Sequence, residues 1–420
     1  MADISTNLSP NVPTNYSMVK PPKRTLARTL DRPQITILHP GYEYAYAYLF
    51  ALPAVDEIVE ASSQNRTWGL HHGTVLIAGG IIAGNAFDDV YLSHDHWGKK
   101  PVKTPRDGIL EEGQYYMQLN SIAGGMTDTS TTPPPSSSTT TLEQYRYPIF
   151  PSFEEWYLPK NLPEEWQQPH NPPNEQTFNL PVPDYVSSRP RCYITDMQIG
   201  IKKAHLIPPS QAEWYMLNGF YHYSPISPGR TGINDQCNKI SLSHHLHLAF
   251  DRSLFVIIPK PSAGSSSSGP QSSTSTVLPT MTTSPTSNNN PQQYAFAVHV
   301  LSNDDEASGL IDNYHNLSLQ PKYLHALNHK FLFVRFAWAL FPHLTIFLHH
   351  SYVARKFIIS KGDEWGYKKM TSLEYIKSRG KGGQNRNGSK CKKRRVGEVI
   401  DEDHGYEDDV SEHVSSGSDA

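Results

Sequence analysis

One stretch of the chain decides how the fold is interpreted. It reads CYITDMQIGIKKAHLIPPS over residues 192–210 and, after a spacer, NDQCNKISLSHHLHLAFDRSLFVIIPK over residues 234–260. The short apolar run in KKAHLIP is stopped by Pro208 and Pro209, so it predicts a strand with His205 at its end. The segment NKISL alternates polar and apolar side chains, which indicates a second, half-buried strand.

A short helix is predicted directly after this second strand, over Ser243–Asp251, with Ser243 as its N-cap. His247 and Asp251 are four residues apart on that helix, so their side chains project from the same face. The face that is predicted to be buried consists of the apolar residues that recur at helical spacing: Leu246, Ala249 and Phe250.

These residue types are suited to hydrolysis of a phosphodiester bond. An imidazole and a carboxylate at His247 and Asp251 can hold a divalent cation and leave coordination positions open for water and phosphate. His205 comes from the facing strand, and its unperturbed pKa near ~6.5 suits a general base that takes a proton from water. The carboxamide of Asn238 can fix either a backbone segment or the orientation of an imidazole.

Each of these residues also has a plain structural interpretation. A histidine on an apolar strand is commonly just a hydrogen-bonded structural residue, and an asparagine before a strand is commonly a turn residue. His244 and His245 lie beside His247, so histidine alone is weak evidence here. The ordered set of residues, and no single member of it, points to a catalytic site.

The order His205, Asn238, His247 resembles the motif of the HNH endonuclease family, and the chain is most similar to fungal proteins that embed this domain in a longer chain. The resemblance covers about 70 residues and implies a ββα-metal core. It implies that His205 is the general base, Asn238 the central asparagine and His247 a metal ligand. Many members carry an Asp or His directly before the first histidine, whereas this chain has Ala204. Asp251 is therefore the expected second metal ligand.

The composition of the chain limits which other kinds of protein it could be. The chain has 420 residues, 37% of them hydrophobic, with 34 prolines, 23 tyrosines and 7 tryptophans. The aromatic residues indicate a genuine core. The three cysteines, Cys192, Cys237 and Cys391, show no CxxC pairing, so neither a disulfide scaffold nor a four-cysteine zinc cage is expected. This cysteine usage suits a reducing compartment, and the polar N-terminus does not predict secretion.

The most apolar stretch, FLFVRFAWALFPHLTIFLHH (residues 331–350), contains Arg335 and Pro342. Because a charge is costly in the middle of a bilayer, the stretch favours a buried helix followed by a second apolar segment, and no membrane partner is expected. The glycines of TVLIAGGIIAGNAF (residues 74–87) match neither phosphate-loop pattern, so a tight turn or a close-packed buried segment is expected there. No small-molecule cofactor is expected.

The predicted fold class is α+β. The resemblance implies that a ββα-metal, HNH-type core is embedded in a larger mixed domain, and composition shifts predict disordered tails and low-complexity insertions. The strands SLFVIIP and YAFAVHVLS are expected to pair as a hairpin across the second insertion. Beyond Leu317 the pattern is helical to about Phe341. The expected ranges are 1–33, a disordered arm; 34–184, an N-terminal α+β region with the insert 126–141; 185–302, the HNH domain with the insert 261–293; 303–370, a C-terminal helical extension; and 371–420, a disordered tail that is first basic and then acidic.

The expected partner is nucleic acid, and DNA in the first place. Since the net charge is -3, contact should be local, through Lys202, Lys203, Arg252 and the basic tail. Lys202 and Lys203 are equally compatible with the solvated end of an edge strand. The basic run KCKKRR (residues 390–395) is typical of a nuclear import signal, so the expected location is intracellular and nuclear import is one alternative for this run.

The sequence thus favours a metal-dependent endonuclease that uses Mg²⁺, Mn²⁺ or Zn²⁺. The alternative is a degenerate HNH fold that binds nucleic acid or serves as a scaffold. Ala204 favours that alternative, while the presence of all three signature residues favours the enzyme.

Overall fold

The computed structural model describes residues 32–58, 67–120, 142–167, 190–223, 232–262, 294–303, 305–324, 327–361 and 364–382. The chain divides into one compact unit that runs to Glu374 and a second that begins at Tyr375. The described residues combine helices with several small, mainly antiparallel sheets, which confirms the predicted α+β class.

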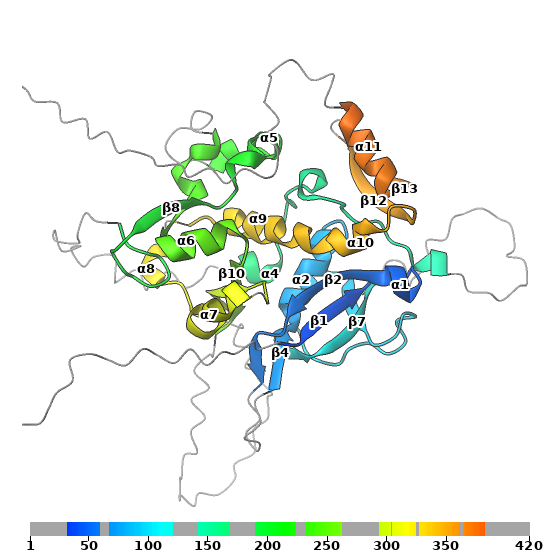
Figure 1. The fold of residues 1–420 in the computed structure, drawn as a ribbon, viewed down its shortest axis with the longest axis horizontal. Coiled ribbons are helices and arrows are strands. Elements are labelled where there is room, and N and C mark those ends of the chain that lie inside the picture. The colour runs from blue at the N-terminus through cyan, green and yellow to red at the C-terminus, as the bar shows by residue number, and fades with distance from the viewer. Residues whose placement is uncertain are drawn as a thin grey trace, which may run out of the picture. The chain divides into compact units, whose positions relative to one another are not determined.

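A four-stranded mixed sheet organises the N-terminal region (Figure 1), with the strand order β2-β1-β7-β5. Strand β1 (Gln34–Leu38) pairs antiparallel with β2 (Tyr48–Pro53) and parallel with β7 (Gly113–Leu119). Strand β7 pairs antiparallel with β5 (Val90–Ser93). All residues of β2 except the first are buried, so this strand is part of the core and not a solvent-facing edge.

The glycine-rich stretch forms helix α2 (His72–Ile82), in which every residue is buried. A Cβ added at Gly79 would lie 2.3 Å from the sulfur of Met117, and one at Gly80 would lie 2.6 Å from the ring of Phe87. The glycines therefore allow close packing of the helix against its neighbours. The prediction of a close-packed buried segment is confirmed.

A second, antiparallel sheet follows the order β3-β4-β6: β3 (Asp56–Ile58), β4 (Thr67–His71) and β6 (Ile109–Glu111). Short helical segments connect these elements and those that follow: α1 (Tyr44–Ala47), η1 (Leu142–Tyr145), η2 (Phe153–Glu155), α4 (Glu164–Gln167), η4 (Pro209–Gln211), α5 (Ala212–Leu217), η5 (Phe220–Tyr223), η6 (Gly232–Asn234) and η7 (Gln236–Asn238).

The predicted ββα unit is present. Strand β8 (Ile201–His205) pairs antiparallel with β9 (Lys239–Ser243), and helix α6 (His244–Asp251) follows β9 directly and packs on both strands. Ser243 occupies the N-cap position as predicted, although its side chain makes no capping hydrogen bond. The buried face of α6 has the predicted members, Leu246, Ala249 and Phe250.

The hairpin that follows is also as predicted. Strand β10 (Phe255–Pro261) pairs antiparallel with β11 (Tyr294–Val300), from Phe255 opposite Val300 to Pro261 opposite Tyr294. Helix α9 (His329–Leu340) packs on β10 and also contacts α2. Elements from the N-terminal, HNH and C-terminal ranges therefore share one core, and the predicted boundaries between these ranges stay predictions.

The C-terminal range is less helical than predicted. Helices α7 (Asp305–Tyr314), α8 (Pro321–Leu324) and α9 are followed by η8 (Phe341–Leu344) and α10 (Thr345–His349). Strands β12 (Ala354–Lys361) and β13 (Glu364–Thr371) then form an antiparallel hairpin. The prediction of a helical extension over 303–370 is corrected by this hairpin, in which Phe357 and Ile358 are buried.

The tail also begins later than predicted. Residues Ser372–Gly382 form helix α11 instead of the start of a disordered segment. Thr371 accepts a 3.2 Å hydrogen bond from the backbone N–H of Glu374, and the Glu374 carboxylate accepts a 2.7 Å bond from the backbone N–H of Thr371. This reciprocal capping box starts the helix, and its T-x-x-E signature is readable in the sequence.

Several predictions fall outside the described residues: the N-terminal arm to residue 31, the insert 126–141, nearly all of the insert 261–293 and the basic run 390–395. One described helical stretch, His329–His349, is long and apolar enough to cross a membrane by length and composition, and 67% of its most apolar window is buried inside the protein. The interior packing of that stretch agrees with the predicted buried helix, and the expected absence of a membrane partner stays a prediction. Cys192 and Cys237 are free thiols.

Candidate active site

His205 stands at the end of β8, as the two following prolines predict. It pairs with Lys239 of β9 and is half-buried. Its Nε2 lies 3.1 Å from Oδ1 of Asn234, which comes from the short η6 turn. As the amide is placed, Oδ1 accepts a hydrogen bond from Nε2–H. That tautomer leaves the lone pair of Nδ1 to accept a proton.

Asn238 is fully buried just before β9, and its side chain holds the chain that leaves His205. Oδ1 accepts a 2.7 Å hydrogen bond from the backbone N–H of Ile207, and Nδ2 donates to the carbonyls of Ile207, at 2.9 Å, and Ile233, at 2.8 Å. Of the two predicted uses of this carboxamide, the structure shows the first: it fixes backbone. The side chain of Asn238 is therefore spent on backbone hydrogen bonds.

His247 and Asp251 project from one face of α6. The Nδ1 atom of His247 lies 3.4 Å from Oδ2 of Asp251, and the side chains are 23% and 50% exposed. An imidazole and a carboxylate at this separation are both partly open to solvent, which suits two ligands of one divalent cation. The donor set therefore fits the expected metal ion with two protein ligands and room for water and phosphate oxygens.

A cavity of about 290 Å³ brings these groups together. It lies where the end of β8, one face of α6 and one face of α9 converge. Its lining residues are His205, Pro208, Pro209, His247, Asp251, Arg335 and Trp338. The cavity thus unites the predicted base with both predicted metal ligands, although they come from two elements separated by the spacer of the motif.

Arg335 of α9 lines the same cavity, and the sequence analysis missed it as a site residue. It is 1% exposed, its guanidinium lies 4.0 Å above the ring of Phe250 and 4.5 Å from that of Trp338, and it donates to the carbonyl of Phe250. Its Nε has no hydrogen-bond partner within the described parts of the chain. Burial lowers the pKa of Arg335 to about 9, while Asp251 acts to raise it, so the group stays a cation at neutral pH.

The signal for Arg335 was a charge inside an apolar helix, which the sequence analysis used only to argue against a membrane span. A buried arginine needs an anionic or aromatic partner. Asp251 and Arg335 are far apart in sequence, so local sequence patterns do not predict that they line the same cavity.

The predicted nucleic-acid contacts are at the surface near the site. Lys202, Lys203 and Arg252 are exposed, and Lys203 donates a 2.8 Å hydrogen bond to Gln236. Successive side chains of a strand point to opposite faces, so Lys203, and not Lys202, shares the face of His205. None of the three residues lines the cavity.

A different set of metal-ligating atoms lies away from the motif. Among the described residues, Asp56, His299 and His315 are the one group of three or more whose ligand atoms all lie within 4.8 Å of one another. A cation is already present there, because the buried ammonium of Lys260 lies 2.5 Å from both Asp56 Oδ1 and Asn316 Oδ1. We interpret this cluster as a buried ion-pair network.

Comparison with protein families matches residues 189–258 to the HNH endonuclease family, which confirms the resemblance that the ordered residues imply. The match begins before β8 and ends in β10, so it contains His205, Asn238, His247 and Asp251 and leaves out Arg335. Neither the curated proteins nor the solved structures give a match to the chain. The comparisons therefore show an HNH endonuclease domain over residues 189–258 of a longer chain.

Proposed function

We propose that the protein is a metal-dependent nuclease that hydrolyses phosphodiester bonds in DNA. The observation that carries this proposal is the single cavity lined by His205, His247, Asp251 and Arg335. It supplies a base, two metal ligands and a fixed cation around one volume large enough for a phosphodiester group, and the family match supports a nuclease.

His205 is the base in this proposal. Asn234 holds its Nε2, so Nδ1 takes the proton of the attacking water. Asn238 fixes the backbone after β8 and thereby the position of the imidazole. His247 and Asp251 would hold a divalent cation, which when bound supplies Lewis-acid stabilisation of the phosphate oxygens and of the leaving group.

Arg335 adds a second positive charge, beside the divalent cation, for the negatively charged phosphate. Its guanidinium is held by the Phe250 carbonyl and by two aromatic rings, so it is pre-oriented before a substrate arrives. A pre-organised cation next to a non-bridging phosphate oxygen stabilises the charge that develops in the transition state.

Nicking of supercoiled plasmid tests the proposal. The full-length protein is expected to nick with Mg²⁺, Mn²⁺ or Zn²⁺ and to stop when EDTA is added. His247→Ala should lose most of this activity. His244→Ala is the matched control, because this exposed histidine is on the same helix and lies outside the cavity. Equal activity of the two variants would refute the assigned site.

A second candidate function is a catalytically degenerate domain that binds nucleic acid or serves as a scaffold. Ala204, where many members of the family have a metal ligand, is fully buried and offers no donor atom. The motif itself, within the described residues, also provides no group of three close ligand atoms. Under this alternative the protein binds DNA in EDTA and nicks it with none of the three metals.

A further inference from the structure

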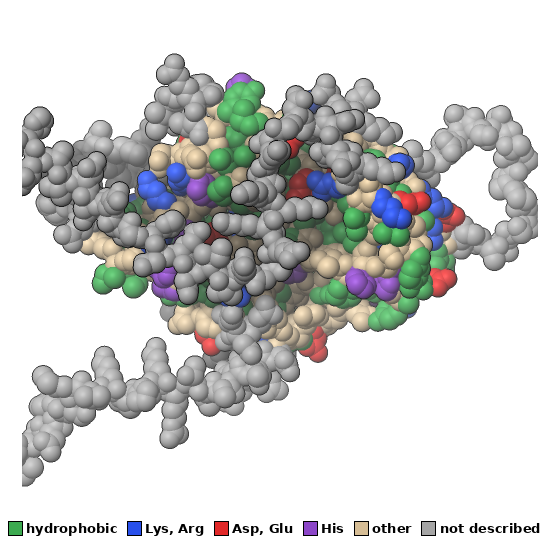
Figure 2. Space-filling model, turned by 45° about the horizontal axis from the view of Figure 1, so that its top comes forward, with side chains coloured by type: hydrophobic (Ala, Val, Ile, Leu, Met, Phe, Trp, Pro, Cys, Tyr) green, Lys and Arg blue, Asp and Glu red, His purple; other side chains and the backbone are tan. Residues whose placement is uncertain are grey.

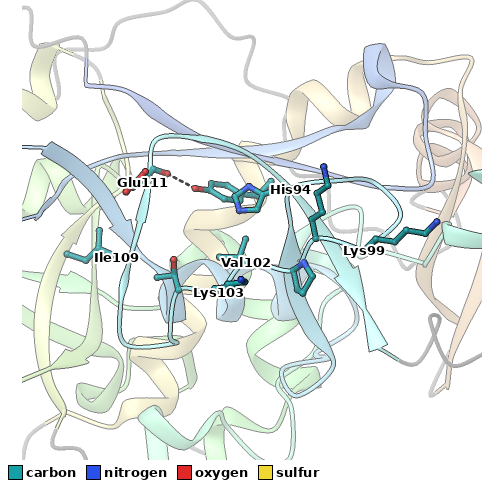
Figure 3. Close-up of a pocket in the computed structure, with 10 residues that line it drawn as sticks. His94, Lys99, Val102, Lys103, Ile109 and Glu111 are labelled. Carbon is teal, nitrogen blue, oxygen red and sulfur yellow. Dashed lines mark hydrogen bonds between the residues drawn. The ribbon is translucent and has the colours of Figure 1, made fainter.

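A second and larger cavity, of about 550 Å³, lies in the N-terminal region and shares no residue with the active-site cavity. It lies between the loop that follows β5 and the strands β6 and β7 (Figure 3). Three lysines, Lys99, Lys100 and Lys103, are among the residues that line it.

The charges of this pocket are unbalanced. Lys99, Lys100 and Lys103 are exposed, and none of their ammonium groups has an ion-pair or hydrogen-bond partner among the residues that the structure describes. Glu111 is the one carboxylate among the described lining residues, and Figure 3 shows it on the far side of the pocket from Lys99. Such a surplus of positive charge around a hollow attracts an anion. Figure 2 shows that Lys and Arg side chains form separate groups on the visible face of the molecule.

The loop that carries two of these lysines is well ordered by its own hydrogen bonds. Asp95 Oδ1 accepts from the backbone N–H groups of Trp97, at 2.9 Å, and Lys99, at 3.1 Å. The backbone N–H of His94 donates to the Lys100 carbonyl at 2.9 Å, and Gln118 donates to the His96 carbonyl at 3.0 Å. The backbone positions of the lysines are therefore fixed before any ligand binds, which lowers the entropic cost of binding.

We propose that this pocket binds backbone phosphates of the polynucleotide that the active site cleaves, and the choice of a polynucleotide rests on the proposed function. A polynucleotide and a small phosphate ligand both offer an anionic phosphate group, and the three lysine ammonium groups can pair with its charge. Among the described residues that line the pocket there is no arginine and no buried cation of the kind that encloses one small phosphate. Exposed lysines spaced along a fixed loop suit the repeated charges of a nucleic-acid backbone better.

The test is the salt dependence of DNA binding by the full-length protein in EDTA, where no metal-dependent cleavage occurs. The variant Lys99→Gln with Lys100→Gln and Lys103→Gln should bind a short duplex roughly tenfold more weakly at low salt. The slope of log K against log salt should become shallower by about 0.9 for each lost contact. Glu111→Gln should tighten binding, which a merely misfolded protein would not do.

The control removes the same charge elsewhere. Lys160→Gln, Lys368→Gln and Lys369→Gln change three exposed lysines that lie outside the pocket, and binding should change much less. Equal losses in the two triple variants would show that only net charge matters and would overturn the proposal. Plasmid nicking by the unmutated protein is followed in parallel. If the unmutated protein nicks plasmid but the pocket variant keeps the same slope of log K against log salt, the pocket proposal is refuted and the nuclease proposal is not.

Lysine acetylation with mass-spectrometric readout separates the two sources of phosphate. Duplex DNA should protect Lys99, Lys100 and Lys103 from acetylation, and it should leave Lys160 and Lys368 reactive. Inorganic phosphate or a mononucleotide at the same phosphate concentration should protect the pocket lysines far less. Equal protection by a small phosphate would mean that the pocket serves a small ligand, and the polynucleotide proposal would fall.

Discussion

The Oδ1 atom of Asn238 accepts a 2.7 Å hydrogen bond from the backbone N–H of Ile207, which joins the start of β9 to the chain that leaves β8. Because Asn238 is fully buried and also donates to two carbonyls, its loss leaves several polar groups unpaired away from water. The central residue of the motif therefore fixes the backbone that follows His205.

Asn238→Ala should lower the free energy of unfolding by about 2–4 kcal/mol, because the unpaired buried groups each carry a desolvation cost. Urea denaturation measures this. Asn234→Ala is the matched control, since Asn234 is exposed and its Oδ1 lies 3.1 Å from Nε2 of His205. That control should keep its stability to within about 0.5 kcal/mol and lose nicking rate. Similar stabilities for the two variants would contradict the positioning role of Asn238.

Arg335→Met should reduce kcat/KM for nicking by about 10²–10³-fold, the usual loss when a pre-organised donor to a developing oxyanion is removed. Methionine fills apolar space between Phe250 and Trp338, so the fold should persist. Arg335→Lys keeps the charge without the planar fork and should recover part of the rate. If Arg335→Met lost stability and kept its kcat/KM in the folded fraction, Arg335 would be structural only.

Stability should depend on pH because several histidines are buried, His39 and His71 among them. Burial lowers the pKa of His39 to about 3, and burial together with Lys260 lowers that of His71 to about 4. In the unfolded chain both titrate near ~6.5, so the unfolded state binds more protons below that pH. Their contribution to stability is complete above about pH 6.5 and is lost as the pH falls toward 4 and then 3.

Melting temperatures from pH 8 to pH 4 check this window. His71 is the N-cap of α2, and its Nδ1 accepts a 3.2 Å hydrogen bond from the backbone N–H of Thr74. His71→Asn keeps a capping side chain and removes the titrating ring, so its melting curve should depend less on pH than that of the unmutated protein. An equally steep dependence in this variant would mean that His71 does not contribute.

The Asp56 network should be sensitive to the loss of one charge. Burial alone would raise the pKa of Asp56, but Lys260 and His315 hold it well below its usual range. Asp56→Asn leaves the Lys260 ammonium buried without its counter-charge, so the free energy of unfolding should fall by about 3–5 kcal/mol. Asp56→Asn with Lys260→Met should recover part of that loss. Additive effects in this double-mutant cycle would contradict the ion pair.

Local sequence patterns predicted the ββα unit well. Pro208 and Pro209 fix the end of β8, and the spacing of Leu246, Ala249 and Phe250 fixes which face of α6 is buried, so His247 and Asp251 had to share the other. These features depend on residues close in sequence. The β10–β11 pairing was also predictable, because both strands alternate and one insert separates them.

Long-range packing was not predictable in this way. Arg335 enters the active-site cavity because α9 packs on β10, and nothing in the local pattern around either element specifies that contact. The Asp56–Lys260 network joins β3 to β10 across about half of the chain for the same reason. The hairpin of β12 and β13 was missed although its strands are rich in Phe, Ile and Tyr, because charged residues interrupt their apolar pattern.

The most direct test is the rate of plasmid nicking as a function of divalent metal concentration for the unmutated protein, His205→Ala and His247→Ala. His205→Ala should lower the maximal rate by roughly 10²–10⁴-fold at every metal concentration, with the half-saturating concentration unchanged. His247→Ala should shift that concentration upward and be partly rescued by excess metal. The result that contradicts the account is an unmutated protein that nicks with no divalent ion, or two variants whose metal curves change in the same way.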